Sequence, residues 1–536
     1  MMNNKTQPFT TAMTQKIGAD RQIAIHTQVI KRPVDVFLTI GVFFDGTANN
    51  AINTSIRQEY QQALARGEEP DLDFPLFNSS YNNEHTNVYK LYQMYYSDDD
   101  KTVDSLPKDK NKIVHYQLKV YIEGVGTDIA KSDNNLGLAT GLSSTGIKGK
   151  INRAIIKIES ELNRFLDKNS KICIQQIRYD VFGFSRGAAT ARYFANIVAD
   201  KVRDNSKQGI NNPLTKMLTI ALKNKISPTW QGPVNGQVHF LGIFDTVAGI
   251  CRLANFFDAG DANTFDIDIK IRRESAKCGL HIVAANEYRH NFALNDVPDF
   301  FNKVSLPGAH SDIGGGYPNN DVDENIYITK IYQETDIYLG KKSNIQKKLQ
   351  QALTRFRCHP DLQYLFYGLS EDNFYQWQTR VRYDNSNYTN TYGVIRNKRV
   401  VKFGLDRIAL RVMYNEAIKQ GCVFDTFDND FDVPNEIQIV ANKIIMAAKN
   451  YQDYLLNDSE KRLILNQYTH SSVEYVRYFM TKETEIDIME KSTGQLAKVK
   501  WHKLVEKPEA LTSLLQVHLP HFNQEGNWQR VIHPNQ

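Results

Sequence analysis

The sequence has no hydrophobic run long enough to cross a lipid bilayer. The longest apolar stretch near the N-terminus, 36–44, is interrupted by Thr39 and Gly41 and is far shorter than the roughly 18–20 residues of a spanning helix. The first 20 residues are polar and lack the basic and then apolar regions of a secretory signal peptide. We therefore expect a protein made in the cytoplasm and carried out, if at all, by a dedicated machine.

The sequence also lacks the common metal, redox and nucleotide motifs. Its 5 cysteines are too widely spaced for a CxxC motif, and it contains no HExxH, EF-hand or GxGxxG pattern. Residues 141–146 resemble the start of a phosphate loop, but Ile147 stands where that loop needs a lysine. We therefore expect no cofactor and no metal ion.

A large excess of charge of one sign is missing as well. The formal net charge is +5 over 536 residues, far below the charge density of a nucleic-acid-binding protein. We expect no nucleic-acid partner, although attraction to anionic lipid is permitted. The chain is instead rich in core-forming residues, with 41% hydrophobic residues, 27 Tyr and 27 Phe, which indicates a globular protein.

Apolar runs typical of buried strands alternate with amphipathic helical patterns in the first part of the chain. The predicted strands are 35–44, 117–122, 177–182, 238–244 and 303–306, and the predicted helices include 151–165 and 188–202. This alternation predicts an α/β fold of the α/β-hydrolase type, with a mostly parallel sheet flanked by helices. Ligands of such sheets bind at the carboxyl ends of the strands.

Composition changes along the chain predict three regions. Residues 1–28 form a polar N-terminal arm, and 29–320 form the catalytic domain, with an insertion at about 49–112. Residues 321–536 form a helix-rich and aromatic-rich region, with helical patterns such as 406–420 and 435–456.

The sequence GFSRG at 183–187 is a G-x-S-x-G motif between a predicted strand and a predicted helix. A serine hydroxyl becomes an effective nucleophile when it is exposed on a sharp strand-to-helix turn, and the glycines allow that turn. Ser185 is therefore the predicted nucleophile, although a plain glycine-flanked turn is the alternative interpretation.

A base and an acid follow in the order found in α/β-hydrolases. Asp245 ends the predicted strand 238–244, and His310 follows the predicted strand 303–306. We predict that His310 is the general base and that Asp245 orients it. Asp312 is the alternative acid, but it lies only two residues from His310, where reaching that imidazole is awkward. His470 is interpreted as a structural residue.

The loop after the first strand is a candidate for the oxyanion hole. The N–H of Arg186, directly after the nucleophile, would supply one donor and the N–H of Gly46 the other, with Asp45 in a supporting role. A plain turn at 45–47 is an equally weighted alternative.

Six motifs occur in an order that resembles a bacterial α/β-hydrolase family, the first group of type VI secretion lipase effectors. They are GVFFDGTANN at 41–50, TNVY at 86–89, GVGT at 124–127, GFSRGA at 183–188, FDTVA at 244–248 and PGAHSDIGGGY at 307–317. The resemblance covers about 37–317, with weaker similarity at 405–421.

The resemblance implies a serine lipid esterase of the phospholipase A type that attacks membrane phospholipids of a target bacterium. It also implies delivery by the type VI apparatus into the target periplasm, a spike-protein partner and a cognate immunity protein. The residues alone leave two alternatives open, a soluble carboxylesterase or peptidase of the same fold and an inactive adaptor of the secretion apparatus.

A lipase needs an apolar surface beside its site. The segments 362–377 and 439–456 are candidates for walls or a lid over the crevice. The alternative is that their aromatic side chains form the core of an auxiliary domain.

Overall fold

The computed structural model describes most of the chain between residues 33 and 535. The larger gaps are 67–82, 126–145, 200–211, 250–266, 337–344, 368–380, 383–387, 474–482, 490–495 and 503–519, and the smaller ones are 48, 229, 231–232, 234, 366 and 472. The predicted arm 1–28 and most of the candidate lid segment 362–377 lie outside the described residues.

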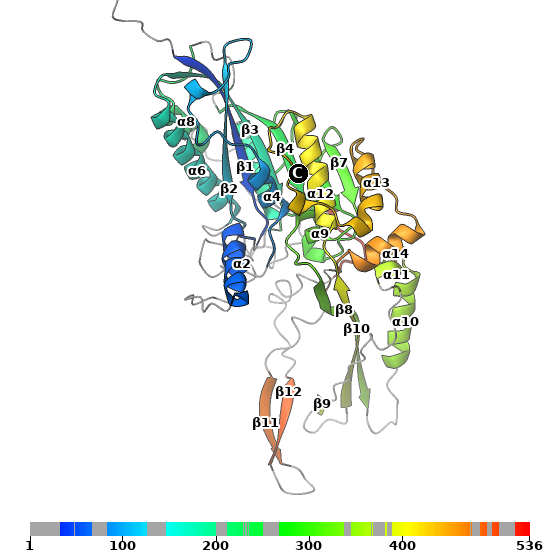
Figure 1. Cartoon of the computed structure of the whole chain (residues 1–536). Helices are drawn as coiled ribbons and strands as arrows, with labels where there is room; N and C mark the ends of the chain where they lie inside the picture. The colour runs from blue at the N-terminus through cyan, green and yellow to red at the C-terminus, as the bar shows by residue number, and fades with distance from the viewer. Residues whose placement is uncertain are drawn as a thin grey trace, which may run out of the picture.

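A six-stranded sheet forms the centre of the molecule (Figure 1). Its order is β2-β1-β3-β4-β5-β7, and every neighbouring pair is parallel. The strands are β1 (Val34–Phe44), β2 (Val114–Ile122), β3 (Ile172–Phe184), β4 (Gln237–Phe244), β5 (Cys278–Ala284) and β7 (Asn302–Leu306). The predicted α/β class with a parallel sheet is confirmed, and the carboxyl ends of all six strands meet along one edge.

Helices cover both faces of this sheet. One face packs against α6 (Ile147–Lys168), α7 (Arg186–Val198) and α8 (Pro213–Ala221), whose apolar side chains share a core with the sheet. The other face packs against α4 (Asn87–Met94), α12 (Leu405–Lys419) and α13 (Gln438–Ala448). The strands are therefore buried on both sides, which explains their nearly continuous apolar sequences.

The C-terminal region contributes much of the second layer. Leu410 and Met413 of α12 belong to the same buried cluster as Phe182 and Phe240 of the sheet. The predicted helix-rich C-terminal region is confirmed, since it also contains α10 (Ile345–Cys358), α11 (Leu362–Leu365) and α14 (Asp458–Gln467). No helix in the described part of the chain combines the length and apolarity needed to span a bilayer.

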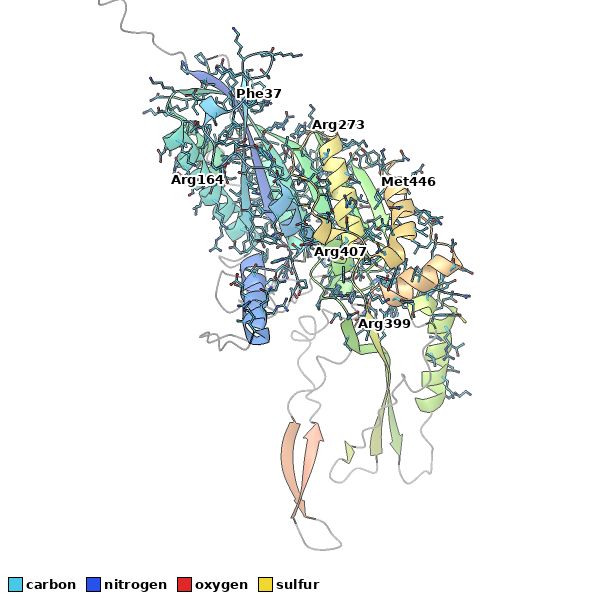
Figure 2. All side chains as sticks on the ribbon, in the orientation of Figure 1. Phe37, Arg164, Arg273, Arg399, Arg407 and Met446 are labelled. Carbon is cyan, nitrogen blue, oxygen red and sulfur yellow. The ribbon has the colours of Figure 1, made fainter. Side chains whose placement is uncertain are left out.

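Several elements were not predicted from the sequence. Among them are the helices α2 (Ala51–Ala65), α8, α10 and α14, the strand β5, and the strands β8 (Asp321–Asp336), β9 (Val381–Arg382), β10 (Tyr388–Val401), β11 (Glu483–Met489) and β12 (Leu496–His502). The antiparallel pairs β8–β10 and β11–β12 project away from the central sheet (Figure 1). Arg399 lies where β10 meets the body of the molecule (Figure 2), and it donates to Asp323 of β8 at 2.8 Å.

Candidate active site

Ser185 lies on a sharp turn between β3 and α7. Its backbone has φ 58° and ψ −125°, a left-handed conformation that costs a non-glycine residue free energy and is typical of a nucleophile elbow. The Ser185 N–H donates to the carbonyl of Phe244 at 3.1 Å, which ties the turn to the end of β4. The strained turn is therefore held in place by the neighbouring strand.

The two glycines of the motif allow the backbone to approach closely on either side of this serine. A Cβ atom on Gly187 would lie 2.3 Å from the carbonyl oxygens of Phe44 and Asp45, and one on Gly183 would lie 2.5 Å from the Gly187 oxygen. Gly187 is therefore needed because the end of β1 passes directly behind the turn, and Gly183 is needed because the start of α7 folds back against it.

Asp245 immediately follows β4 and is completely buried. Its own φ is 40°, and its N–H donates to Ile282 of β5 at 2.7 Å. One carboxylate oxygen accepts the Ala284 N–H at 2.9 Å, and the other lies 2.5 Å from His310 Nδ1. The strand ends thus aim the carboxylate at the histidine.

His310 opens α9 (His310–Gly314), which follows β7. Its ring lies between Phe184, at a centroid distance of 4.7 Å, and Phe292, at 5.0 Å. Since Phe184 is the neighbour of Ser185, this packing brings the histidine ring to the nucleophile turn. The His310 Nε2 atom is buried and has no hydrogen-bond partner within the described part of the chain, so it is the nitrogen available to act as a base.

A residue near the end of the described chain completes this group. Arg530 donates to both carboxylate oxygens of Asp245, at 2.7 and 2.8 Å. Burial alone would raise the pKa of Asp245, but the charges and hydrogen bonds of Arg530 and His310 outweigh burial and hold that pKa well below its usual range. Arg530 carries no recognisable motif, and the sequence analysis missed it.

A buried ion pair lies beneath the histidine. Glu287 accepts the backbone N–H of His310 at 3.2 Å and pairs with Arg289 at 2.8 Å. Burial favours the neutral acid, yet the charge and hydrogen bonds of Arg289 lower the pKa of Glu287 to about 2. Burial also lowers the pKa of His310, while Asp245 opposes that shift. His310 is therefore disposed to be a neutral base.

Asp312, the alternative acid, contacts a different histidine. It lies 2.6 Å from His470 Nδ1, and it also accepts the N–H groups of His470 and Ala309 at 2.9 and 2.8 Å. Asp312 thus links the start of α9 to the segment after α14. The sequence analysis interpreted His470 as structural but did not predict this pairing.

The candidate oxyanion residues lie beside the nucleophile turn. Arg186 is the first residue of α7, next to Ser185. The Gly46 N–H donates to the carboxylate of Asp45 at 2.7 Å, and the same carboxylate accepts the hydroxyl groups of Thr86 and Tyr121 at 2.7 and 2.5 Å. The Gly46 N–H thus already has an acceptor in the Asp45 carboxylate. Arg186 directly follows Ser185, which is the position of an oxyanion-hole donor in α/β-hydrolases.

Among the residues that the structure describes, two groups of side chains have donor atoms close enough together for a metal ion, and both have protein partners. Asp180, His239 and Cys422 form one group, in which Asp180 is bonded to Tyr95 at 2.7 Å and to His239 at 3.1 Å. The other group is Asp321, Asp323 and His470, in which Asp323 pairs with Arg399. We assign no metal to either group.

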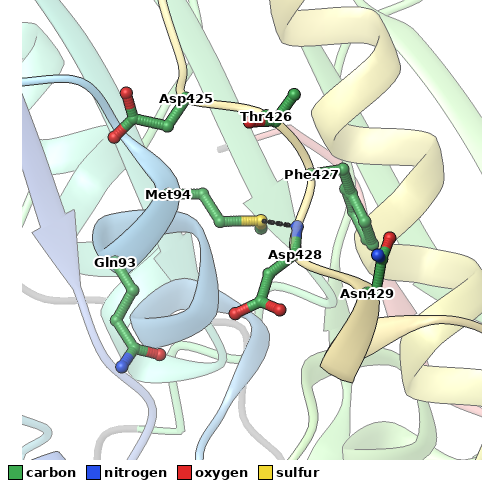
Figure 3. A pocket seen from close by; sticks show the side chains of 7 residues that line it. All are labelled: Gln93, Met94, Asp425, Thr426, Phe427, Asp428 and Asn429. Atoms are coloured by element: carbon green, nitrogen blue, oxygen red, sulfur yellow. Dashed lines mark hydrogen bonds between the residues drawn. The ribbon is translucent and has the colours of Figure 1, made fainter.

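A polar cavity of about 600 Å³ lies between the end of α4 and residues 425–429, and none of its lining residues belongs to the group around His310. Figure 3 shows its walls, where the Asp428 N–H donates to the Met94 sulfur at 3.5 Å. It is therefore separate from the candidate active site.

Comparison with solved structures shows that this chain shares its fold with a known protein. The structure described as "Structure of the Tle1 effector bound to the VgrG spike from the Type 6 secretion system" aligns with a TM-score of 0.64 and 24% identity, over 94% of this chain and 95% of that chain. An uncharacterized protein from Pseudomonas aeruginosa aligns with a TM-score of only 0.33 and 18% identity, over 82% of this chain and 54% of that chain. Among curated proteins, none matches this chain.

The family model described as "T6SS, Phospholipase effector Tle1-like, catalytic domain" matches residues 39–334. This match confirms the resemblance to the type VI lipase effectors and its implication of a lipid ester hydrolase. Because the matched segment covers more than half of the sequence, the chain belongs to the Tle1-like family of type VI secretion phospholipase effectors and carries its catalytic domain.

Proposed function

We propose that this phospholipase hydrolyses an acyl ester of membrane glycerophospholipids with Ser185 as nucleophile, His310 as general base and Asp245 as the residue that orients His310. The main support is the buried contact between Asp245 and His310 Nδ1 at 2.5 Å. The other ring nitrogen of His310, Nε2, has no hydrogen-bond partner within the described residues, and the ring packs on Phe184 of the nucleophile turn.

The reaction follows from this arrangement. The Ser185 Oγ attacks the ester carbonyl while His310 Nε2 accepts the hydroxyl proton, and Asp245 stabilises the imidazolium that results. The ester C–O bond then breaks, and His310 returns the proton to the departing lysophospholipid oxygen. Water attacks the acyl-serine with His310 again as base, which releases a fatty acid and restores Ser185.

The negative charge on the carbonyl oxygen needs hydrogen-bond donors. The Arg186 N–H belongs to the first turn of α7, where the helix dipole favours an anion. The Gly46 N–H serves as a second donor if it exchanges the Asp45 carboxylate for the oxyanion. Asp45 therefore supports the site by holding Gly46 in place before the substrate arrives.

The family membership supports a route of delivery and a set of partners. We propose an antibacterial role, in which the protein is made in the bacterial cytoplasm, loaded onto a spike protein of the type VI apparatus and delivered into the periplasm of a target cell. The related effector of the solved complex is bound to a VgrG spike. We also propose a cognate immunity protein, which would protect the producing cell.

Vesicles of defined phosphatidylethanolamine and phosphatidylglycerol, labelled in one acyl chain, test this function. We expect the wild type to release fatty acid and lysophospholipid, and Ser185→Ala to release neither. Asp245→Asn should lower kcat by about 10⁴-fold, as expected for loss of the orienting carboxylate, whereas the matched control Asp312→Asn should lower it less than about tenfold. The reverse ranking would move the acid role to Asp312, and turnover by Ser185→Ala would remove Ser185 as nucleophile.

A further inference from the structure

A C-terminal segment, 520–535, lies across the loop that joins β5 to β7, and we call it the strap. It is fixed at several points along its length. These are a β-bridge between Pro520 and Arg289, the parallel pairing of β13 (Ile532–His533) with β6 (Leu294–Asn295), the buried side chain of Trp528 against Tyr288, and hydrogen bonds of Asn535 with Arg192 and Ile271. The end of the described chain therefore packs on the loop between β5 and β7.

The strap presents one cation to the active site. The Arg530 guanidinium forms a fork on Asp245, with one nitrogen on each carboxylate oxygen. The same guanidinium donates to the carbonyls of Ala284 and Phe292 at 3.0 to 3.2 Å, and its side chain is only 9% exposed. Such a planar two-point contact fixes the orientation of a carboxylate as well as its charge.

From this geometry we propose that Arg530 is a positioning residue of the active site, which acts on His310 through Asp245. The two-point contact fixes the plane of the Asp245 carboxylate, which orients the imidazole. The positive charge of Arg530 also weakens the electrostatic attraction of Asp245 for a proton on His310. The proposal rests on the function proposed above. It also extends the catalytic unit to a residue far beyond the family match at 39–334.

The charges around His310 come from four other parts of the chain. Asp245 follows β4, Glu287 and Arg289 follow β5, and Arg530 lies on the strap. Within α9 itself, Asp312 is paired with His470 of the segment after α14. Among the described residues, the hydrogen bonds of Arg530 go to Asp245, Ala284 and Phe292, so we expect the Glu287–Arg289 and Asp312–His470 pairs to remain intact when Arg530 is replaced. Asp245 then loses the cation that contacts it, and Glu287 loses a more distant one but keeps Arg289. The stronger negative field at His310 would favour its protonated, inactive form.

The test compares full-length Arg530→Gln with the wild type on a soluble short-chain ester over a range of pH. We expect the acid limb of the kcat/KM profile to move up by about one pH unit, the scale of a shift caused by one nearby charge. We also expect kcat to fall about tenfold because the carboxylate loses its fixed orientation. Arg530→Lys, which keeps the charge but lacks the planar fork, should keep the wild-type acid limb with a lowered kcat.

Arg192→Gln is the matched control, because Arg192 is a buried arginine that binds Asn535 of the strap and the carbonyl of Asn295 without contacting Asp245. We expect it to lower the melting temperature and leave the acid limb in place. An Arg530→Gln profile identical to that of the control would overturn the proposal. Where Arg530→Gln does not fold, a wild-type kcat in Arg530→Lys would overturn it instead.

Asp245→Asn separates the two hypotheses. If Asp245→Asn turns over like the wild type, the triad itself is wrong. If Asp245→Asn is impaired and Arg530→Gln behaves like the wild type, only the role of Arg530 fails. Addition of Arg530→Gln to Asp245→Asn should cost less than about twofold, because residues that act through one another are not additive.

Discussion

Asp45 and Asp245 follow two strands of the same sheet, and both are buried, yet their pKa values shift in opposite directions. Asp45 accepts hydrogen bonds from the neutral groups of Gly46, Thr86 and Tyr121, and burial outweighs them and raises its pKa from 3.8 to about 6. Asp245 contacts the full positive charge of Arg530, which keeps it ionised. Burial thus decides the pKa of Asp45, whereas a cation in contact with Asp245 reverses the effect of burial there.

The raised pKa of Asp45 makes a prediction for stability. Between pH 3.8 and about 6 the folded protein binds this proton more tightly than the unfolded chain does. The Asp45 contribution to the free energy of unfolding therefore falls as the pH rises through that window, by about 3 kcal/mol at roughly 1.4 kcal/mol per pKa unit, and stays constant above it. Asp45→Asn cannot ionise, so we expect its stability relative to the wild type to rise between pH 4 and pH 7.

Denaturant unfolding of both proteins at pH 4, 5, 6 and 7 measures this difference. A difference that stays constant over the range would show that Asp45 has the same pKa in the folded and unfolded states.

Single residues were predictable where a motif or a strand end marked them. Asp245 and His310 were selected because each follows an apolar run, and the structure places them in contact. Arg530 and Glu287 were not predicted, because no local sequence pattern marks a charged residue whose role is to position another side chain. The pairing of Asp312 with His470 joins residues far apart in sequence, and no pattern predicts such a contact.

At the scale of elements, the nucleophile turn depends on the tight crossing of β1, β3 and α7. Gly187→Ala would place a Cβ atom 2.3 Å from two carbonyl oxygens at the end of β1. Because backbone atoms cannot move aside cheaply, we expect a loss of several kcal/mol, in the range seen for overpacked cores, and little remaining activity.

Gly526→Ala provides the comparison, since Gly526 has φ +78° and nothing within 4 Å of its missing Cβ. It should cost only the roughly 1 kcal/mol of a left-handed backbone and leave hydrolysis nearly unchanged. Thermal melts and turnover of the two variants measure the contrast. Equal melting temperatures for the two variants would contradict the clash.

The elements that sequence analysis missed share a physical reason. β5 contains Gly279 and the buried His281, so its apolar run is interrupted, although parallel pairing with β4 and β7 completes the strand. The strands β8 and β10 contain many polar residues and pair with each other away from the sheet. A strand that is stabilised mainly by pairing with its neighbours has a less apolar sequence, and is harder to predict, than a strand that is buried on both faces.

At the scale of the whole molecule, the helical layer that contains α13 leaves two large apolar side chains of that helix exposed. On α13, Ile439 is 75% exposed and Met446 is 70% exposed, two turns apart on one side of the helix, and Figure 2 shows Met446 at the outer edge of the molecule. This face belongs to the segment 439–456, for which a role beside the lipid site remains a prediction.

The double substitution of Ile439 and Met446 by Ser tests that role. We expect selective loss of hydrolysis on vesicles, by about tenfold, with hydrolysis of a soluble ester retained, because exposed apolar area contributes to lipid binding and not to the chemistry. Ile220→Ser is the matched control, since Ile220 is 66% exposed on α8, which covers the opposite face of the sheet. Equal losses on both substrates would assign the α13 face to folding.

The contact between Asp245 and Arg530 joins positions 285 residues apart, and this separation has a consequence for folding. Closing so long a loop costs conformational entropy before the contact returns any free energy, and contacts of large sequence separation slow folding. The elbow at Ser185 is held by the end of the neighbouring strand β4, whereas the contact of Arg530 with Asp245 needs both ends of the long loop in place. With Arg530 in its proposed role, we therefore expect full catalytic competence to require the finished tertiary structure and to be acquired after the sheet has formed.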